Sequence, residues 1–515
     1  MIIIMSNYNL AKEGGLLFHI GNHNSEAQNC KKSTSSQHEE DIDNVERETT
    51  NVTKDNDQIK TLESLDKNGS GFFNPIMTVY RDFIVLTSKV LYRKQIECAI
   101  KFQGGIENVK PSDYSQSPFH FVDPFSGCGP LPIRIMTELV KTRNEMQQQH
   151  YSKSKASINC PSLPQFPIQI SANDLSKDCE KLIRENYIQN SLVDQNLNSD
   201  KDDSLKFEII SKDANLFLHR INSFKDKEYI PANHIHLDPF GCCTPYLDSA
   251  MSALDIQVKK DGSSSGILSL TATDIGVLYD RRYIDNCRRH YNILHLNKKR
   301  SNIFREQAVR IILYAIASSA GRVRDAGIKK VLYAFPYAHF ILVAVEIDFK
   351  SKNETISKLK MSKGSEGPFY MGELFDSDFV HQMNIQSKEY QSIYSKDTQK
   401  LLETLMKTDC LYHSYQENNY VEIMPQVLSP WFHYLPEIAK KLELGSIPKK
   451  HKIISYLQDK GYVACGTVFD PNGIRLGGTL VKKKDERICN EEEFISQMIL
   501  ELIATTKCDN SSKIS

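Results

Sequence analysis

Short apolar runs alternate with stretches of helical periodicity between residues 119 and 347, and this alternation is the clearest pattern in the chain. The runs that predict strands occupy 119–123, 166–174, 207–214, 234–241 and 266–274. A long apolar helix, expected at about 303–320, leads to a terminal hairpin at 331–347, whose two strands we expect Pro336 to separate. Strands alternating with helices predict an α/β fold with a doubly wound, mostly parallel, Rossmann-like sheet.

The pattern changes on both sides of this region. An apolar patch within residues 1–20 predicts a short hairpin or strand, whereas residues 21–68 are polar, with almost no aromatics, and predict a disordered insertion. Beyond Phe349, two helical patterns and a hairpin around 470–473 predict a C-terminal α+β, winged-helix-like domain. We therefore expect an N-terminal segment at 1–70, a main domain at 71–349, a C-terminal domain at 350–505 and a tail at 506–515.

The composition restricts the class of protein. The chain has 515 residues, with 64 basic and 64 acidic side chains, so any nucleic-acid contact must be a local basic patch. Its 12 cysteines form no C-x-x-C pair, which predicts reduced thiols and an intracellular protein. The opening MIIIM is too short for a membrane span, so we expect no contact with a membrane.

A glycine-containing turn follows the first strand of the sheet. Asp123 ends that strand, and Gly127 and Gly129 precede a helical pattern. Glycine lets backbone N–H groups approach a ligand closely, and the carboxylate suits a ligand with a cationic end. S-adenosylmethionine, which has an amino group and a sulfonium, fits this description. An ordinary turn between a strand and a helix is the alternative.

Four consecutive strands are followed by an aspartate, namely Asp123, Asp174, Asp213 and Asp238. A single aspartate there is usually a helix N-cap, but ligands of open α/β sheets bind at the same strand ends. We expect Asp174 to accept hydrogen bonds from ribose hydroxyls, and Asp213 with the N–H of Ala214 to pair with an adenine edge. The series predicts a cofactor that contains adenosine.

The fourth strand continues into Asp238, Pro239, Phe240 and Gly241. A carboxylate and backbone carbonyls that accept the N–H bonds of an exocyclic amine orient its lone pair toward a methyl donor. Pro239 stiffens the turn and Phe240 offers a face on which a base can stack. A purely structural turn is the alternative.

The same strand carries two histidines that could bind a metal. His234 and His236 lie on one face of it, but no third ligand is close in the sequence, so we expect packing histidines and no metal. Cys242 and Cys243 flank the expected base pocket, as lining residues or as a reactive thiol.

A run of motifs resembles a known family. GFFNPIMTVYRD, DPFSGCGPLPIR, SAND, DAN, HLDPFG, PYLDSA, GILSLTATD, GPFYMG and GYVACGTVFDPNGIR are similar, in order and spacing, to segments of the tRNA (guanine-26, N2)-dimethyltransferases. The resemblance is strong over residues 71–349 and weaker to about 480. It implies transfer of one or two methyl groups from S-adenosylmethionine to a tRNA guanine, flipped out of its stack.

The resemblance also implies roles for individual residues. Carried over by position, the cofactor contacts are Arg81, Asp123, Gly127, Gly129, Asp174, Asp213 and Ala214. Asp238 would hold the guanine amine between Phe72 and Phe240. The region 71–349 becomes the methyltransferase domain, and 350–505 the tRNA-binding domain.

Several residues depart from the family pattern. Tyr80 stands where the family has Asn, and Leu131 where it usually has Arg, so that a contact to the cofactor carboxylate is lost or moves to Arg134. A Thr-His pair of the family reads Thr467-Val468 here. A basic patch that contacts tRNA phosphates, or else a solvated surface, is expected from Lys449, Lys450, Lys452, Arg475, Lys482, Lys483 and Lys484.

Two other functions stay open on this sequence. One is methylation of an adenine or cytosine amine in another RNA, and the other is a catalytically silent RNA-binding protein, which Leu131 and Val468 would favour. The family works in the nuclei and mitochondria of eukaryotes, so we expect the nucleus first and the mitochondrion second. We expect a monomer.

Overall fold

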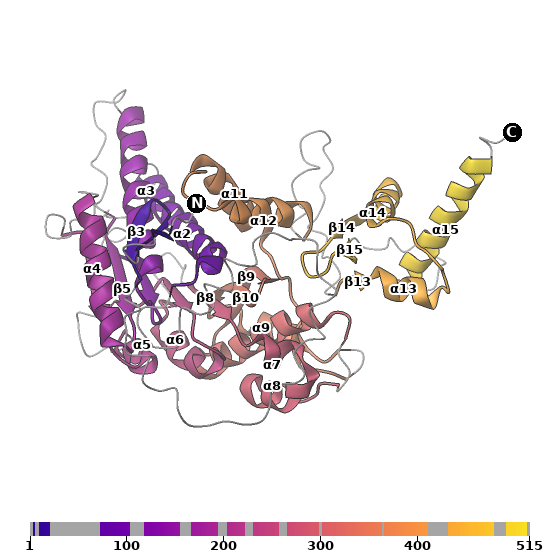
Figure 1. Ribbon diagram of the computed structural model, residues 1–515, viewed down its shortest axis with the longest axis horizontal. Helices are drawn as coiled ribbons and strands as arrows, with labels where there is room; N and C mark the ends of the chain where they lie inside the picture. Colours follow the sequence, from indigo (N-terminus) through magenta and orange to yellow (C-terminus); the bar gives the residue numbers. More distant parts are fainter. Residues whose placement is uncertain are drawn as a thin grey trace.

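The computed structural model describes residues 4–5, 10–20, 73–103, 118–154, 166–193, 203–221, 230–256, 265–297, 301–362, 365–409, 431–477 and 491–511. These residues form a large α/β body and a smaller C-terminal part, which is drawn in yellow at the right of Figure 1. Phe72 and residues 482–484 lie outside the described ranges. Within those ranges, no helix is both long enough and apolar enough to span a membrane.

A seven-stranded sheet of order β6-β5-β4-β7-β8-β10-β9 forms the centre of the large body. Its strands are β4 (Phe119–Asp123), β5 (Ile168–Asn173), β6 (Leu205–Ile210), β7 (His234–Leu237), β8 (Gly266–Ala272), β9 (Gly327–Tyr337) and β10 (Phe340–Asp348). The strands β4 to β8 are parallel, and β10 is antiparallel to β8 and β9. The predicted doubly wound, mostly parallel sheet is confirmed.

The order of the strands reverses at β4, which pairs with β5 on one side and with β7 on the other. Every residue of β4, β5, β7 and β8 is buried, as expected for parallel strands covered by helices on both faces. A reversal of this kind opens a crevice at the carboxyl ends of the strands. The loops that follow β4, β5 and β7 therefore meet at one edge of the sheet.

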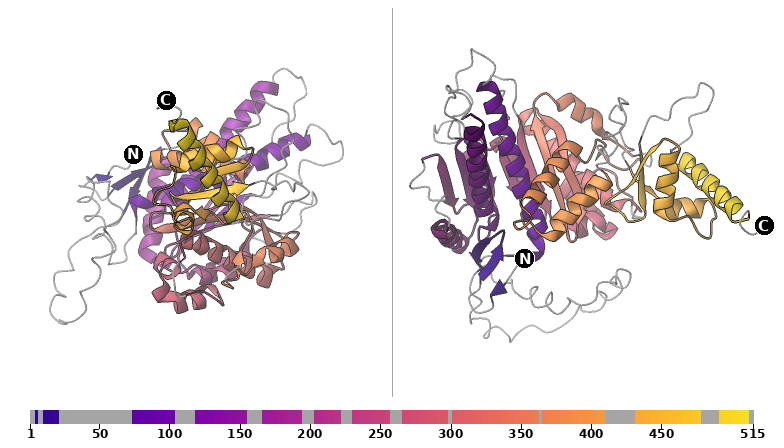
Figure 2. Two further views of the ribbon diagram at one scale, coloured as in Figure 1. Left: turned by 90° about the vertical axis from the view of Figure 1, so that its right-hand side faces the viewer. Right: turned by 90° about the horizontal axis from the view of Figure 1, so that it is seen from above.

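Helices cover both faces of the sheet, as Figures 1 and 2 show. On one face lie α2 (Thr78–Gln103), α3 (Pro130–Ser154) and α4 (Lys177–Val193), with α2 packed on α3. The other face carries α5 (Ala214–Ile221), α6 (Leu247–Ala253) and α9 (Phe304–Arg324), with α7 (Ile275–Tyr279) and α8 (Ile284–Tyr291) packed beside α9.

An N-terminal three-stranded sheet packs against α4 in the large body. Its strands are β1 (Ile4–Met5), β2 (Leu10–Glu13) and β3 (Leu16–His19), so the predicted hairpin is confirmed. The side chain of Asn190 bonds the backbone N–H and carbonyl of Leu17, and the side chain of Asn186 does the same at His19. Figure 2 shows these strands in indigo beside the purple helices.

The segment after the sheet returns to the large body. It contains α10 (Lys352–Lys358), β11 (Leu359–Lys360), β12 (Phe369–Tyr370), α11 (Ser377–Glu389) and α12 (Lys396–Lys407). Both α11 and α12 pack on α2, and their buried apolar side chains belong to the core of the large body. The boundary near residue 350 stays a prediction, since the core of the large body extends past it.

The C-terminal part has a core of its own. It comprises β13 (His433–Tyr434), α13 (Leu435–Lys441), α14 (Lys450–Asp459), β14 (Val463–Gly466), β15 (Gly473–Gly477) and α15 (Glu491–Ser511). The sheet has the order β13-β15-β14. Two helices followed by a hairpin are the predicted winged-helix-like order, with β13 and α15 added at the ends.

One detail of the predicted terminal hairpin is wrong. Pro336 does not separate two strands, because it lies inside β9 opposite Ile341, and the turn falls at Ala338 and His339. The strand β9 is an edge strand of the sheet. An edge strand tolerates proline where the missing N–H would have pointed to solvent.

Candidate active site

The loop after β4 adopts the geometry that its glycines predict. Gly127 and Gly129 have φ of 54° and 88°, in the left-handed region. A Cβ on Gly129 would lie 3.2 Å from the Ile183 side chain, so the loop packs closely on α4. The N–H of Gly127 donates to Asp174 Oδ2 at 3.0 Å, and this bond ties the loop after β4 to the loop after β5.

Asp123 lies at the base of this loop and is buried. Its Oδ1 accepts a hydrogen bond from the N–H of Phe125 at 3.1 Å. Burial raises the pKa of the Asp123 carboxyl to about 8, and the nearby charges of Asp238 and Asp174 act in the same direction. An acid with this pKa is largely protonated at neutral pH, and a cationic ligand would favour its ionised form.

The acids after β5 and β6 are more open. Asp174 is half-buried and also accepts from the N–H of Ser176 at 2.9 Å. Asp213 is exposed and caps α5, since its Oδ1 accepts from the N–H groups of Asn215 and Leu216 at 3.0 and 3.2 Å. Ala214 is buried in the first turn of α5. The N-cap alternative therefore describes Asp213, and the cofactor roles of the three residues stay predictions.

Asp238 follows β7, across the reversal from Asp123. The residue is half-buried, and burial raises the pKa of its carboxyl to about 6. The hydrogen bond from Tyr80 and the charge of Arg81 act in the opposite direction and lower the pKa. Pro239 is buried, whereas the Phe240 side chain is 79% exposed at the tip of the loop. Gly241 has φ of 81°, and its N–H donates to Thr273 Oγ1 at 3.3 Å.

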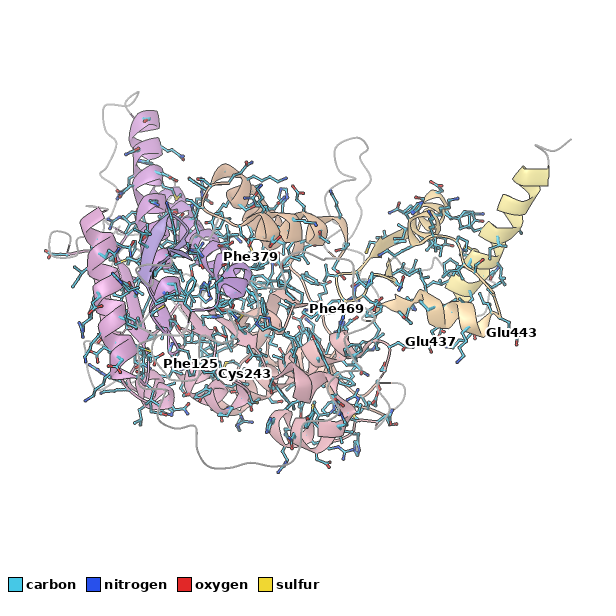
Figure 3. The ribbon with its side chains drawn as sticks, viewed as in Figure 1. Phe125, Cys243, Phe379, Glu437, Glu443 and Phe469 are labelled. Atoms are coloured by element: carbon cyan, nitrogen blue, oxygen red, sulfur yellow. The ribbon has the colours of Figure 1, made fainter. Side chains whose placement is uncertain are left out.

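The two loops are in contact. The ring of Phe125, from the loop after β4, meets the ring of Tyr246, from the connection after β7, with centroids 4.8 Å apart. Figure 3 labels Phe125 and Cys243, one in each of these connections. The structure thus brings Asp123, Asp174 and Asp238 to one edge of the sheet, as the sequence predicted.

Tyr80 is a further residue of the site, and the sequence marks it only as a departure from the family pattern. Its side chain hydrogen-bonds Asp238, and its ring stacks on that of His236 at 5.5 Å. Burial raises the pKa of Tyr80 well above its usual value, so the hydroxyl stays neutral and donates. Tyr80 lies in α2, one residue before Arg81, and its place in the sequence does not indicate a contact with Asp238 after β7.

Arg81 is predicted to contact the cofactor, and its guanidinium is buried beside several acceptors. Its Nε and Nη2 donate to the two oxygens of Glu13 at 2.8 and 2.6 Å, and Nη2 also donates to the carbonyl of Asn74 at 3.0 Å. The positive charge of Arg81 lowers the pKa of Asp238 and so favours the ionised carboxylate. The Arg81 side chain also bonds that of Tyr80. A direct cofactor contact of Arg81 stays a prediction.

The alternative that moved a cofactor contact to Arg134 is wrong for this structure. Arg134 is buried, with Nη1 bonded to Glu13 at 2.5 Å and Nη2 bonded to Asp82 at 2.6 Å. Two carboxylates already neutralise this guanidinium. Its function is to join α3 to the N-terminal hairpin and to α2.

The histidines of β7 are buried and pack as expected. His234 bonds Ser88 at 2.9 Å and Ser269 at 2.8 Å, and His236 bonds Ser269 at 3.0 Å. Burial lowers the pKa of His236 to about 3, so its ring is neutral. A neutral ring is a suitable surface for the stacked phenol of Tyr80.

In the C-terminal part, the structure separates two kinds of basic residue. Arg475 is buried and bonds Asp409 and Glu306, so its assignment to a phosphate-contacting surface is wrong. Lys440, Lys449 and Lys450 instead line a cavity of about 580 Å³ between α13 and α14, together with Asn472 and apolar side chains. The cavity therefore presents three lysine side chains of the C-terminal part to a ligand.

The strand order, with β10 antiparallel to its neighbours, and the glycine loop after β4 are those of the class I methyltransferase fold. A family model described as N2,N2-dimethylguanosine tRNA methyltransferase matches residues 166–362. Over 451 residues the chain is 25% identical to a tRNA (guanine(26)-N(2))-dimethyltransferase of Methanococcus aeolicus, which covers 84% of this chain and 96% of that protein.

Two further comparisons agree. A tRNA (guanine(27)-N(2))-dimethyltransferase of Homo sapiens is 26% identical over 411 residues, which are 62% of this chain and 52% of that protein. The structure of Trm1 from Pyrococcus horikoshii with S-adenosyl-L-methionine superposes with a TM-score of 0.57 and 21% identity, covering 84% of this chain and 96% of that one. The chain is thus similar to the N2,N2-dimethylguanosine tRNA methyltransferases, with residues 166–362 matching the model of that family.

Proposed function

We propose that this protein transfers methyl groups from S-adenosylmethionine to the exocyclic N2 amine of a guanine in tRNA. The observation that carries the proposal is the position of Asp238. Its carboxyl lies at the reversal of the strand order, hydrogen-bonded to Tyr80 and near the buried Asp123 of the glycine loop. A base acceptor and a cofactor site are therefore adjacent.

Asp238 is suited to bind the amine. Its pKa of about 6 makes the carboxylate the main form at neutral pH. An ionised carboxylate accepts an amine N–H, orients the nitrogen lone pair and stabilises the positive charge that develops during transfer. The exposed ring of Phe240, two residues further on, supplies a stacking face for a base taken out of its helix.

The residues of the glycine loop fit S-adenosylmethionine, which supplies an electrophilic methyl group when bound. Gly127 and Gly129 leave room for a ligand against the backbone, and Asp123 offers a desolvated acid to a cationic group. Asp174 and Asp213 would hold the ribose and the adenine edge from the ends of β5 and β6. These cofactor contacts are part of the proposal. It also includes a cofactor contact for Arg81, whose side chain bonds that of Tyr80.

The position of the guanine in tRNA is a finer question. The resemblance of the sequence motifs implied position 26, and one of the relatives above is named for position 26 and the other for position 27. We propose position 26, because the relative named for it matches over nearly its whole length, 96%. The lysine-lined cavity of the C-terminal part supports a contact with the tRNA backbone.

The experiment is methyl transfer from labelled S-adenosylmethionine to unmodified tRNA transcripts with G26, with A26, and with A27 beside an intact G26. We expect label on the first and third, and a loss of at least about 10²-fold in Asp238→Asn. Label that depends on G27 would move the site by one nucleotide. Label on the A26 transcript alone would indicate an adenine amine, and cofactor binding without any transfer would indicate the silent RNA-binding protein.

A further inference from the structure

Three residues with metal-binding side chains converge on the far side of the Phe240 loop. Cys242 lies in the connection after β7, Asp274 follows β8, and His290 lies in the last turn of α8. One potential ligand atom of each lies within 4.8 Å of the other two. They come from three elements of the fold, so tertiary structure alone brings them together.

One oxygen of Asp274 is buried without a regular hydrogen bond. Its Oδ1 accepts a hydrogen bond from Tyr291 at 2.7 Å, while its Oδ2 has no such bond among the described residues, and the carboxylate interacts with the Cys242 thiol and the His290 ring. A thiol is a weak donor, and a buried carboxylate oxygen without a strong partner costs free energy. A cation at this oxygen would remove that cost.

We propose that Cys242, Asp274 and His290 bind one divalent cation, of which Zn²⁺ fits the three ligands best. Zinc takes thiolate, imidazole and carboxylate ligands in a tetrahedron, at about 2.0 to 2.3 Å. Ligand atoms of such a tetrahedron lie roughly 3.3 to 3.8 Å apart. Since the three ligand atoms already lie within 4.8 Å of one another, no pair has to approach by more than about 1.5 Å. The fourth position is left to water.

The surroundings fit a metal site in a second way. The hydrogen bond from Tyr291 fixes one oxygen of Asp274, and a carboxylate oxygen of this residue lies within 4.8 Å of the ligand atoms of Cys242 and His290. Partners of this kind, outside the ligands themselves, are usual at metal sites, where they orient the ligating carboxylate. The Cys242 thiol bonds Thr244 Oγ1 at 3.0 Å, which holds the sulfur in the same loop geometry.

The site has a structural consequence for the loop that bears Phe240. Cys242 lies two residues after Phe240, and a metal would join this loop to β8 and α8, next to the existing bond between Gly241 and Thr273. The three ligands are thus positioning residues for the stacking ring. The inference does not depend on the proposed reaction, because the metal content is measured on the resting protein.

The test is the metal content of the full-length protein purified without chelator, by inductively coupled plasma mass spectrometry. We expect about one zinc per chain in the wild type. Cys242→Ser and His290→Gln should each lose most of it, while the exposed Cys98→Ser and His219→Gln should retain it as matched controls. Protein in which zinc is replaced by Co²⁺ should show a thiolate-to-metal absorption band that Cys242→Ser abolishes.

Wild-type protein with well under one metal per chain, after incubation with excess Zn²⁺ and desalting, would overturn the proposal. So would full zinc content in the double variant Cys242→Ser, His290→Gln. Because the first of these results comes from the wild type, a variant that fails to fold does not leave the inference untested.

Discussion

Tyr80 sets the acidity of Asp238. Its hydroxyl donates to the Asp238 carboxyl and so favours the ionised form, while burial opposes it. We expect Tyr80→Phe to raise the pKa of Asp238, and the acidic limb of the pH dependence of kcat/KM to move up from about 6 by roughly one unit. The measurement is kcat/KM for tRNA methylation between pH 5 and pH 9.

The matched control is Tyr333→Phe, which removes another buried hydroxyl, bonded to Thr87 at 2.8 Å. It should lower the free energy of unfolding by about 1 kcal/mol and leave the acidic limb in place. An unmoved limb in Tyr80→Phe would contradict the role of the hydroxyl at Asp238.

Asp123 couples cofactor binding to proton release. Its pKa of about 8 keeps most of the carboxyl protonated at pH 7 in the free protein, and a cationic ligand lowers that pKa. Binding should therefore release about one proton per chain. The apparent affinity for S-adenosylmethionine should rise with pH until about 8. Calorimetry of S-adenosylmethionine binding at pH 7, in buffers of different ionisation enthalpy, measures the release.

Two variants separate this effect from a simple loss of affinity. Asp123→Asn has no proton to release, so its binding enthalpy should not depend on the buffer. Asp174→Asn should bind more weakly but keep the proton release of the wild type. A wild-type enthalpy independent of the buffer would be evidence against Asp123 as the titrating group.

The N-terminal hairpin is fixed to the catalytic part by buried ion pairs. Glu13 of β2 contacts Arg81 of α2 and Arg134 of α3, and Arg134 also contacts Asp82. Asp82 in turn accepts hydrogen bonds from Ser395 and Thr398 at the start of α12. Four elements distant in sequence therefore meet at one group of charges.

Neutralising Glu13 should destabilise the fold. Glu13→Gln leaves two guanidiniums facing one remaining carboxylate, which we expect to cost about 3 to 5 kcal/mol of the free energy of unfolding. The control Glu180→Gln breaks an exposed pair with Arg184 and should cost less than about 1 kcal/mol. Urea denaturation followed by circular dichroism gives both values, and equal small changes would contradict the buried pairing.

The pH dependence of stability provides a second measurement. Burial alone would raise the pKa of Glu13, but Arg81 and Arg134 outweigh it and hold the pKa at about 2. The stabilisation is therefore complete above the usual pKa of a glutamate and is lost as the pH falls toward 2. Between pH 5 and pH 2, the wild type should lose more stability than Glu13→Gln.

The sequence predicted features that depend on local patterns and missed contacts between residues far apart in the chain. Strands, helices and the acids at strand ends were predictable, because apolar runs and the period of a helix are local signals. The contact of Tyr80 with Asp238 and the pairing of Glu13 with Arg134 were not, since they join residues far apart in the chain. Pro336 was misjudged because its tolerance depends on β9 being an edge strand, which only the sheet order reveals.

The same limit applies to the basic residues of the C-terminal part. Arg475 and Lys450 look alike in the sequence, but one is buried among acids and the other lines a cavity. The cluster of Cys242, Asp274 and His290 was invisible for the same reason, because its spacing follows no metal-binding motif.

At the scale of the whole molecule, Arg475 joins the C-terminal sheet to the large body. Its Nε donates to Asp409 at 2.5 Å, and its Nη2 lies 3.1 Å from Glu306 of α9. Glu306 also bonds Arg310 at 2.7 Å, and Asp409 accepts from Thr467 and from the N–H of Val468. Val468 is the departure from the family's Thr-His pair, and its backbone N–H bonds Asp409 together with the Thr467 hydroxyl.

Phe469 lies beside this group of charges, between the large body and the C-terminal sheet (Figure 3). Its ring stacks on that of Phe432, with centroids 6.5 Å apart, and the Arg475 guanidinium lies 5.4 Å from its centre. At this contact between the two parts, Arg475 of the C-terminal sheet pairs with two buried acids that precede that part in the chain, Glu306 of α9 and Asp409 after α12.

Arg475→Met should uncouple the two parts while leaving the cofactor site intact. Two buried carboxylates would lose their shared cation, at a cost of about 3 to 5 kcal/mol to the contact between the parts. Methylation of tRNA should fall by roughly tenfold or more, because a tRNA held by the C-terminal part would no longer be aligned with Asp238. Affinity for S-adenosylmethionine should stay within about twofold, since none of the contacts described for Arg475 involves the glycine loop.

Isothermal calorimetry and labelled methyl transfer give these two quantities, and hydrogen exchange of β13 to β15 measures the uncoupling directly. Lys452→Met, which removes an exposed charge from α14, is the matched control for loss of a cation and should change hydrogen exchange little. If Arg475→Met and Lys452→Met reduced methylation equally, with unchanged exchange in the C-terminal sheet, Arg475 would act only by its charge. The orientation of the C-terminal part would then have to be fixed by the apolar contact of Phe432 and Phe469.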